Sequence, residues 1–266
     1  MRKLLVAVLA LAAVVAVAGV AVAANVYTVS GSAPSKGKGS ATKPIPTAIK
    51  LSFRVTDTDP SQRGTVVERY ALGSEGLRTN PKFFPKCAFS DLDNDTGVPS
   101  KCNKALVGSG IAKNAAGSSG DRSLEHSSGC NLAVRLYNTG SGMAIRLDAP
   151  QPAVPIDSDQ IGCALPIHTA INGKFVKRRI GGLTASDFQF TVPQNLKHPL
   201  PGIDNSIRRS DTNVKKLVKR VNGKPRGFYE KVGCKGSTRL VRGTFVTEAT
   251  ATQGSQTFTK TSTSKC

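Results

Sequence analysis

The chain has 266 residues, with 37 Lys and Arg against 17 Asp and Glu, a net charge of +20, six Cys and no Trp. This charge excludes an acidic solvating protein, and the hydrophobic fraction of 39% is too high for a disordered polymer. The length suits one large β domain or two small domains, at about 100 to 200 residues for each domain.

The first residues have the layout of an export signal. Basic residues at positions 2 and 3 precede an apolar run, 4–22, which ends in Ala21-Val22-Ala23. A basic start, an apolar middle and a small-residue exit are typical of a secretory signal peptide, so we expect residues 1–23 to be removed, by cleavage after Ala23 or Ala24. The alternative is a membrane tether, because an uncleaved segment 4–24 reaches the roughly 20 residues that span a bilayer.

All cysteines follow this signal, at Cys87, Cys102, Cys130, Cys163, Cys234 and Cys266. Outside the cytoplasm thiols that lie close together are usually oxidised, and an even number suits three disulfides. Six cysteines allow about 15 connectivities, among which we expect each cysteine to pair with its neighbour in sequence. A zinc site is not indicated, because the chain has no Cys-x-x-Cys pair and only three His.

The sequence of the first segment of the mature chain indicates no regular secondary structure. Residues 24–44 are rich in Ser, Gly and Lys, which is typical of a flexible spacer, so we expect a single domain over residues 45–266. Apolar residues then alternate with polar ones over residues 49–55, and this period of two predicts a half-buried strand. The Gly-rich and Ser-rich stretch 108–129 is expected to be a long loop or an edge excursion between strands.

Several later segments continue the pattern of short strands. Alternation at 132–136 and at 143–147, around a turn at 138–142, predicts a hairpin. Further strands are expected near 165–171 and 188–192. The Thr-dense segments 244–250 and 256–264 predict a final hairpin with one solvated face.

One segment permits two interpretations. Val214, Leu217, Val218 and Val221 have the spacing of an amphipathic helix, whereas Asn222-Gly223 is a strong hairpin-turn pair before a return strand at 228–232. We favour the hairpin. The whole set of short strands then predicts an all-β fold, an antiparallel β-sandwich of jelly-roll or Greek-key type stapled by disulfides.

Four stretches of sequence occur in a fixed order along the chain: Phe84-Pro85-Lys86-Cys87, then Cys102-Asn103-Lys104-Ala105-Leu106-Val107-Gly108-Ser109-Gly110, then the strand 132–137, then Gly227-Phe228-Tyr229 with Cys234 and a Thr-rich hairpin up to Cys266. In this order they resemble a family of uncharacterised exported bacterial proteins, over roughly residues 45–266. The resemblance implies a secreted, disulfide-bearing β-sandwich. It implies no activity, so it transfers no functional residues.

An Asp-rich loop is the candidate for metal chemistry. Asp91, Asp93 and Asp95 precede Gly97, and alternating carboxylates in a tight turn offer oxygens to Ca²⁺. The EF-hand pattern is incomplete, because its glycine and glutamate positions fall on Thr96 and Cys102. Calcium is therefore the only cofactor that the sequence suggests, and a polar turn is the alternative.

Catalytic patterns are weaker. No Gly-x-Ser-x-Gly elbow occurs, and His126, His168 and His198 are scattered along the chain. Glycosidase-type carboxylate pairs converge only in space, so they leave no signature in the sequence. We therefore predict no catalytic residues and expect a protein that is not an enzyme, with a secreted polysaccharide hydrolase or lyase as the alternative.

The positive charge is concentrated in residues 174–242, which hold 17 Lys and Arg against 4 Asp and Glu. Its clusters are Lys177, Arg178, Arg179, Arg208, Arg209, Lys215, Lys216, Lys219 and Arg220. On one face they would attract polyanions, although such clusters also keep a surface solvated. For an exported protein we expect anionic polymers of the cell envelope, or anionic headgroups, rather than nucleic acid. The sequence thus predicts a secreted surface or binding protein whose ligand is not identified.

Overall fold

The computed structural model describes residues 25–95, 97–250 and 254–266. The predicted signal segment and its cleavage site lie outside the described residues. Within them the all-β prediction is confirmed: helix is confined to the short α1 (Gln194–Lys197) and three single 3₁₀ segments, at Pro81–Phe83, Phe89–Asp91 and Ser100–Ala105. None of these helical segments has the length and apolar character that crossing a membrane requires.

One antiparallel sheet of 12 strands forms the body of the molecule. Along the sheet its strands are β1 (Asn25–Ser32), β3 (Ile49–Asp57), β12 (Ile203–Val214), β6 (Leu106–Ser118), β8 (Leu132–Asn138), β9 (Gly142–Ala149), β10 (Ile167–Ile180), β11 (Leu183–Thr191), β4 (Val67–Ser74), β16 (Thr238–Thr247) and β17 (Thr257–Lys265), with β7 (Ser128–Gly129) beside β6. Every pairing along this path is antiparallel, so the connections are hairpins or longer crossings over the sheet ends.

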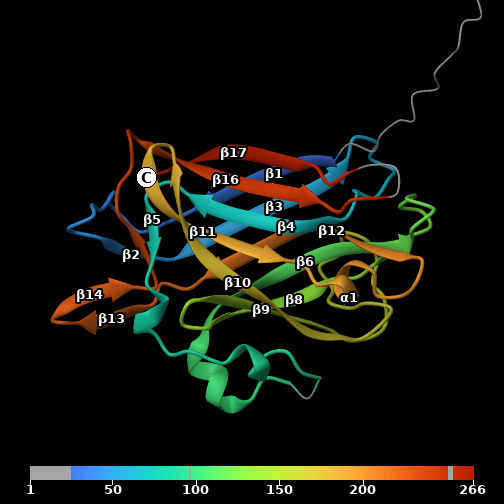
Figure 1. Cartoon of the computed structure of the whole chain (residues 1–266), viewed down its shortest axis with the longest axis horizontal. Coiled ribbons are helices and arrows are strands. Elements are labelled where there is room, and N and C mark those ends of the chain that lie inside the picture. Colours follow the sequence, from blue (N-terminus) through green and yellow to red (C-terminus); the bar gives the residue numbers. More distant parts are fainter. Residues whose placement is uncertain (1–24, 96, 251–253) are drawn as a thin grey trace, which may run out of the picture.

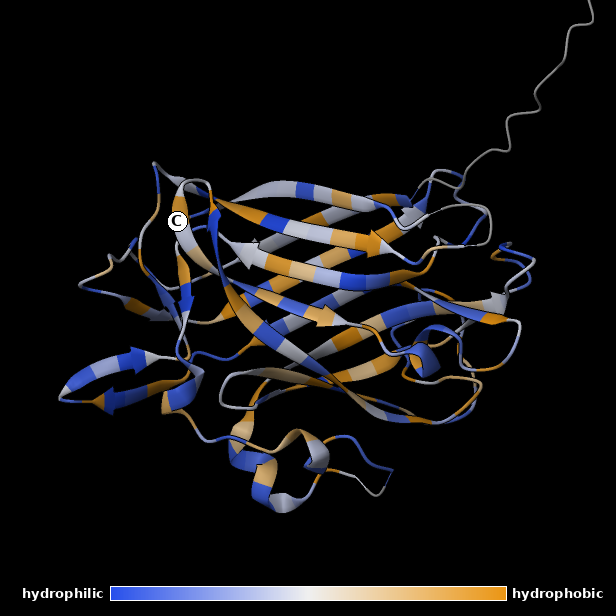
Figure 2. Ribbon diagram, viewed as in Figure 1, coloured by the Kyte–Doolittle hydropathy of each residue, from blue (hydrophilic) through white to orange (hydrophobic). Residues whose placement is uncertain are grey.

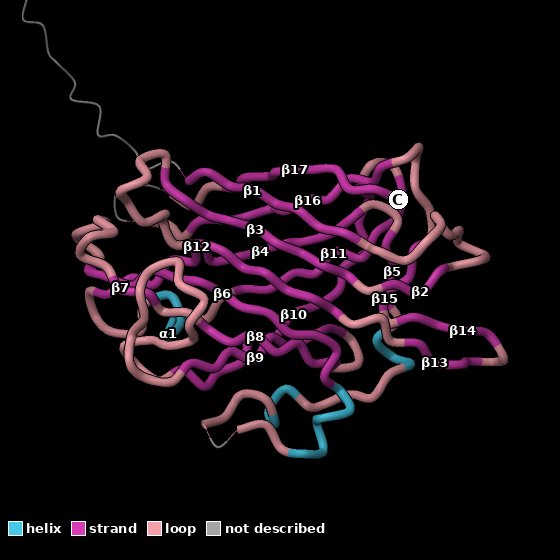
Figure 3. The backbone as a smooth tube through the Cα atoms, turned by 180° about the vertical axis from the view of Figure 1, so that it is seen from behind, coloured by secondary structure: helices cyan, strands magenta, loops and turns pink. Residues whose placement is uncertain are grey.

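The sheet folds back on itself into two facing layers (Figures 1 and 3). The front layer of Figure 1 contains β10, β11, β4, β16 and β17, and the back layer contains β1, β3, β12, β6 and β8, with β9 at the bend between them. The two end strands, β1 and β17, lie side by side. Among the described residues no ladder joins them, so the sheet is nearly closed, with one seam.

Inward side chains from both layers form the core, which Figure 2 shows as orange segments alternating along the strands. Near the seam, Tyr27 of β1 stacks on Phe245 of β16, with ring centroids 4.6 Å apart. Phe53 of β3 packs against Tyr70 of β4 at 5.3 Å. These ring pairs cross from one layer to the other and therefore hold the layers together.

The spacer prediction is wrong for residues 25–32, which form β1. Their side chains alternate between buried and exposed, and β1 pairs with β3 from Asn25 opposite Asp57 to Ser32 opposite Lys50. The Ser and Gly content hid this alternation, because only Tyr27 and Val29 supply large apolar side chains to the core. The domain therefore begins before Ile45.

The long loop expected at 108–129 is wrong for its first half, because residues 108–118 belong to the strand β6. Glycine here serves close packing: a Cβ atom on Gly108 would overlap the carbonyl oxygen of Asn213, and one on Gly110 would overlap that of Asp211. Both oxygens belong to the neighbouring strand β12. The small residues thus let two strands approach, although small residues in sequence are also typical of flexible loops.

The hairpin interpretation of the ambiguous segment is confirmed. β13 (Val218–Val221) pairs with β14 (Lys224–Gly227), and Asn222 and Gly223 have φ values of 51° and 75°, as a two-residue hairpin turn requires. The return strand of this hairpin lies earlier than the predicted 228–232, at Lys224–Gly227. Tyr229–Lys231 is instead β15, the centre of a small sheet between β2 (Ile45–Thr47) and β5 (Leu77–Thr79).

The expected disulfides are present with the expected neighbour pairing: Cys87 with Cys102, Cys130 with Cys163, and Cys234 with Cys266. The last pair ties the far end of β17 to the segment that precedes β16. Three disulfides are typical of a protein that resides in an oxidising, extracytoplasmic compartment.

Candidate functional site

A basic groove runs over the outer surface of the front layer. It has a volume of about 700 Å³ and crosses β10, β11, β4 and β16. Four cationic side chains line it: Arg69, Lys174, Arg178 and Arg242. Uncharged polar groups fill the spaces between them, including Asn172, Gln189, Thr191 and Thr244.

Strand alternation explains why this surface is polar although the same strands form the core. On β4, Tyr70 and Leu72 are buried, whereas Arg69 and Ala71 face outward and line the groove. The register then aligns outward residues of neighbouring strands, so that Lys174 stands opposite Gln189, Gln189 opposite Ala71, and Ala71 opposite Thr244.

Small residues occupy two outward positions of β4. Ala71 lines the groove. At Gly73, two residues further along the strand, a Cβ atom would overlap a carboxylate oxygen of Asp187. Asp187 is the only acidic residue that lines the groove, it is 2% exposed, and it pairs with Arg242 at 3.2 Å. Arg69 pairs with Glu68 at 3.2 Å, whereas Lys174 and Arg178 have no ion-pair partner among the described residues.

The nine basic residues singled out in the sequence do not gather in one place. Lys177, Arg178 and Arg179 are on β10, whereas the others lie on β12, on the connection after it and on β13. Arg178 alone among the nine lines the groove. On β12, Arg208 pairs with Asp157 at 2.8 Å and Arg209 pairs with Asp211, so these charges are partly neutralised.

The sequence analysis missed the remaining groove cations, Arg69, Lys174 and Arg242. None of them belongs to a run of basic residues, and they come from three strands that are far apart in the chain. Only strand order and register bring them together, and the sequence does not reveal either.

The Asp-rich loop packs against the outer surface of β9 and β10 through an arginine. Arg146 of β9 is fully buried and donates hydrogen bonds to the carbonyl oxygens of Leu92 and Asn94, each at 2.7 Å. Its Nε also donates to Asp148 at 2.9 Å. The guanidinium thus anchors the backbone of this loop.

The three carboxylates predicted to bind calcium do not converge in the described residues. Asp91 pairs with Lys101 at 2.8 Å, and Asp93 accepts hydrogen bonds from Thr169 and from the backbone N–H of Ala170. The described group with metal-compatible spacing is Asp91 with Cys87 and Cys102, whose sulfurs form a disulfide. Calcium binding by Asp91, Asp93 and Asp95 stays a prediction.

Each histidine contacts an aspartate, and one of them belongs to a larger cluster at the end of the sheet beside α1. The Nδ1 atom of His198 lies 2.9 Å from Asp204, and its Nε2 atom lies 2.6 Å from Glu248. Lys197 donates to the other oxygen of Glu248 at 2.6 Å. Burial alone would raise the pKa of Glu248, but the hydrogen bonds from Lys197 and His198 outweigh it, so the pKa is lowered.

This cluster joins the two layers. Asp204 is on β12 in the back layer, Glu248 follows β16 in the front layer, and His198 bridges them. Both nitrogens of the ring lie within hydrogen-bond distance of carboxylates, so the ring is fixed between the two layers. The cluster therefore connects the two layers through hydrogen bonds and ion pairs.

Comparison with family models, with curated proteins and with solved structures finds no match to this chain. The resemblance to exported bacterial proteins therefore stays a prediction, and the function has to be argued from the groove.

Proposed function

We propose that this protein is an extracytoplasmic binding protein that holds an anionic polymer of the cell envelope in the basic groove. The observation that carries the proposal is the set of four cations that line one groove on an outer face of the sheet. Closely placed cations attract a polyanion over long distances and gain free energy by releasing its counterions.

The spacing of the cations favours a chain over a single small anion. Lys174 and Arg178 are on β10 and Arg242 is on β16, with β11 and β4 between them. Three strand spacings correspond to about 14 Å, which is more than one phosphate or carboxylate group can bridge. A polymer with repeated negative charges can meet both sides of the groove at once.

The alternative of a polysaccharide hydrolase or lyase has less support. Such an enzyme needs an acid and a base that are free to meet the substrate. In the cluster around His198 the ring nitrogens and both oxygens of Glu248 bond to protein groups. The groove offers cations and amides, with one carboxylate that pairs with Arg242.

Secretion is part of the proposal, supported by the disulfides and by the signal-like start of the sequence. Mass spectrometry of the protein isolated from its native cells tests it. We expect a chain that starts at residue 24 or 25 and no thiol that reacts before reduction. An intact residue 1 would indicate the tethered alternative, and six reactive thiols would overturn the extracytoplasmic assignment.

A matched pair of variants tests the groove. Binding of fluorescent poly(glycerol phosphate) to the full chain is measured by titration in low salt. Lys174→Gln with Arg178→Gln should weaken binding by about tenfold, because two of the four contacts are lost. Lys216→Gln with Arg220→Gln removes the same net charge from the connection after β12 and from β13, whose hairpin projects away from the groove (Figure 1), and should change the affinity by less than about twofold.

Equal losses in the two variants would show that net charge alone drives binding and would reject the groove. Duplex DNA of matched charge serves as a competitor in the same assay. If DNA bound more tightly than the glycerol phosphate polymer, the assignment to an envelope polymer would be wrong.

A further inference from the structure

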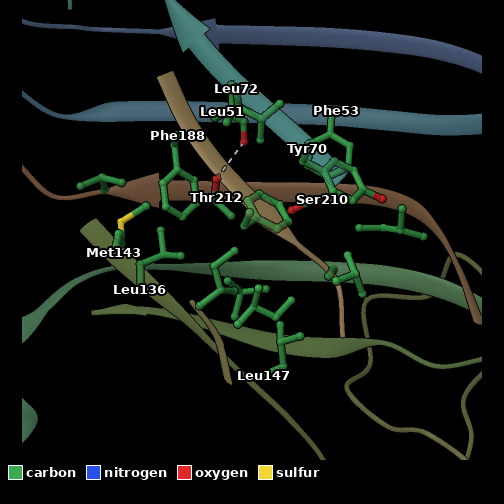
Figure 4. Close-up of a pocket in the computed structure, with 18 of the residues that line it drawn as sticks. Leu51, Phe53, Tyr70, Leu72, Leu136, Met143, Leu147, Phe188, Ser210 and Thr212 are labelled. Atoms are coloured by element: carbon green, nitrogen blue, oxygen red, sulfur yellow. Dashed lines mark hydrogen bonds between the residues drawn. The ribbon is translucent and has the colours of Figure 1, made fainter. Parts of the chain in front are cut away.

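The interior of the sheet contains an apolar cavity, on the opposite side of the strands that form the basic groove. Its volume is about 130 Å³. Figure 4 shows side chains from both layers pointing toward one another around it: Leu51, Phe53, Tyr70, Leu72, Phe188 and Leu136. Both layers therefore define one shared space.

The lining is apolar almost throughout. Leucine, isoleucine, valine, methionine and phenylalanine side chains supply most of it. In Figure 4 Leu147 of β9 lies at its lower side, and Met143 of the same strand lies at its left. Among its hydroxyl groups, that of Thr212 already donates to the carbonyl oxygen of Leu51 at 3.3 Å. Buried water needs two to four polar partners, so this lining favours an apolar occupant over water.

The two ends of the cavity lie at different parts of the fold. Leu196 and Lys197 of α1 line one end, where Lys197 is held by Glu248 at 2.6 Å. Leu77 of β5 and Tyr229 of β15 line the other end, beside the small sheet. Lys197 is 6% exposed and already paired, so the cavity offers no free charge to an ionic ligand.

We infer that this cavity is a binding site for a small, uncharged, apolar molecule about the size of one aromatic ring. An engineered apolar cavity of about 150 Å³ stays dry and binds benzene or xenon, so a cavity of 130 Å³ lies in the same range. Atoms that face an empty space lose dispersion contacts, and a ligand of matching shape restores them. The site is distinct from the groove, because it uses the inward side chains of β4 and β11.

Thermal unfolding of the full, disulfide-bonded chain in the presence of benzene tests the inference. At ten times its Kd, benzene should raise the Tm by about 4 °C, because it binds only the folded state. Benzoate, which has the same ring and a negative charge, should not act through this cavity, and its effect should be lost in high salt.

Filling the cavity should abolish the response. In Leu136→Phe the added ring atoms occupy the space, so benzene should shift the Tm by less than about 1 °C. The matched variant Val218→Phe adds the same group on β13, where Val218 is 50% exposed, and it should keep the full shift. An unchanged Tm of the native protein, or equal shifts in both variants, would overturn the inference.

A second measurement needs no variant. Under xenon pressure, methyl NMR signals of Leu72, Leu136 and Leu147 should shift, because these residues line the cavity. The methyl signals of Leu200, which is 48% exposed, should stay in place. Equal shifts at Leu200 and at the cavity leucines would mean that xenon binds without selecting this site.

Discussion

The two outer faces of the nearly closed sheet differ in charge although both are hollowed. The front face carries the basic groove, whereas the back face carries a hollow of about 500 Å³ over β1, β3, β12 and β6. Its lining consists mainly of Ser, Gly, Thr and Asn residues, with one Leu, one Lys and one Asp. There Asp211 accepts a hydrogen bond from Ser52 at 2.6 Å and pairs with Arg209.

The comparison shows that concavity and charge have separate origins. On both faces a glycine admits the close approach of a neighbouring group: Gly110 in the back hollow, and Gly73 next to Asp187 of the front groove. The front groove holds four cations, of which Lys174 and Arg178 of β10 have no ion-pair partner among the described residues, whereas the back hollow holds one lysine beside one aspartate. A ligand that recognises charge should therefore distinguish the faces, and a packing change should not.

The largest expected effect comes from the back face. Gly110→Ala would place a Cβ atom on the backbone oxygen of Asp211, which cannot move without disturbing β12, so unfolding should become easier by about 3 kcal/mol. Gly73→Ala meets the side chains of Asp187 and Ile180, which can adjust, and should cost about 1 kcal/mol. Urea unfolding of both variants measures the difference, and an equal cost would contradict the distinction between backbone and side-chain contacts.

The second largest effect is expected from reversing charges in the front groove, which tests whether the polymer binds that face. Lys174→Glu with Arg178→Glu replaces two attractions by two repulsions in the groove and should weaken binding of poly(glycerol phosphate) about 30-fold. The slope of log affinity against log salt, about −3 for four contacts, should become shallower by about 2. An unchanged slope would mean that the polymer contacts other cations.

The cluster of Lys197, His198 and Glu248, which connects the two layers, should lose stability in acid. The pKa of Glu248 lies below its ordinary value of 4.5 in the folded chain, so its contribution to stability is present above pH 4.5 and is lost as the pH falls through the lowered pKa. Glu248→Gln should therefore lower stability at pH 7 by about 1 kcal/mol and by less at pH 3. The free energy of unfolding at both pH values tests this, and an equal loss at both would contradict it.

The smallest expected effect comes from the lysine of the back face. Lys50→Gln removes a charge from a hollow that also contains Asp211, and it should change polymer affinity by less than about twofold. The same titration measures it. A loss as large as that of a groove cation would place the polymer on both faces or on the back face alone.

Sequence patterns predicted the elements whose apolar residues alternate in full. The strand at 49–55, the hairpin around residues 138–142 and the final Thr-rich hairpin are all present as β3, β8 with β9, and β16 with β17. The patterns failed where small residues replace large ones, in β1 and β6. There the burial of a strand depends on what approaches it, which is a property of the partner strand.

The groove could not be predicted for a related reason. A run of charges such as Lys177-Arg178-Arg179 is conspicuous in sequence, yet alternation along a strand sends its members to different sides, and only Arg178 lines the groove. Arg69 and Arg242 are isolated in sequence and line the same groove because β4 pairs with β16. Pairing between distant strands, which creates this site, leaves no trace in local composition.

The seam between β1 and β17 affects whether this protein associates with other protein chains. An unpaired strand edge is a template on which another chain can add a strand, and this is a route to aggregation. Here the two edges lie against each other, with Tyr27 and Phe258 in contact at 5.0 Å across the seam, and the disulfide between Cys234 and Cys266 anchors the end of β17. Each edge thus blocks access to the other. The disulfide keeps the end of β17 in place during local opening of the sheet, so the two edges stay covered.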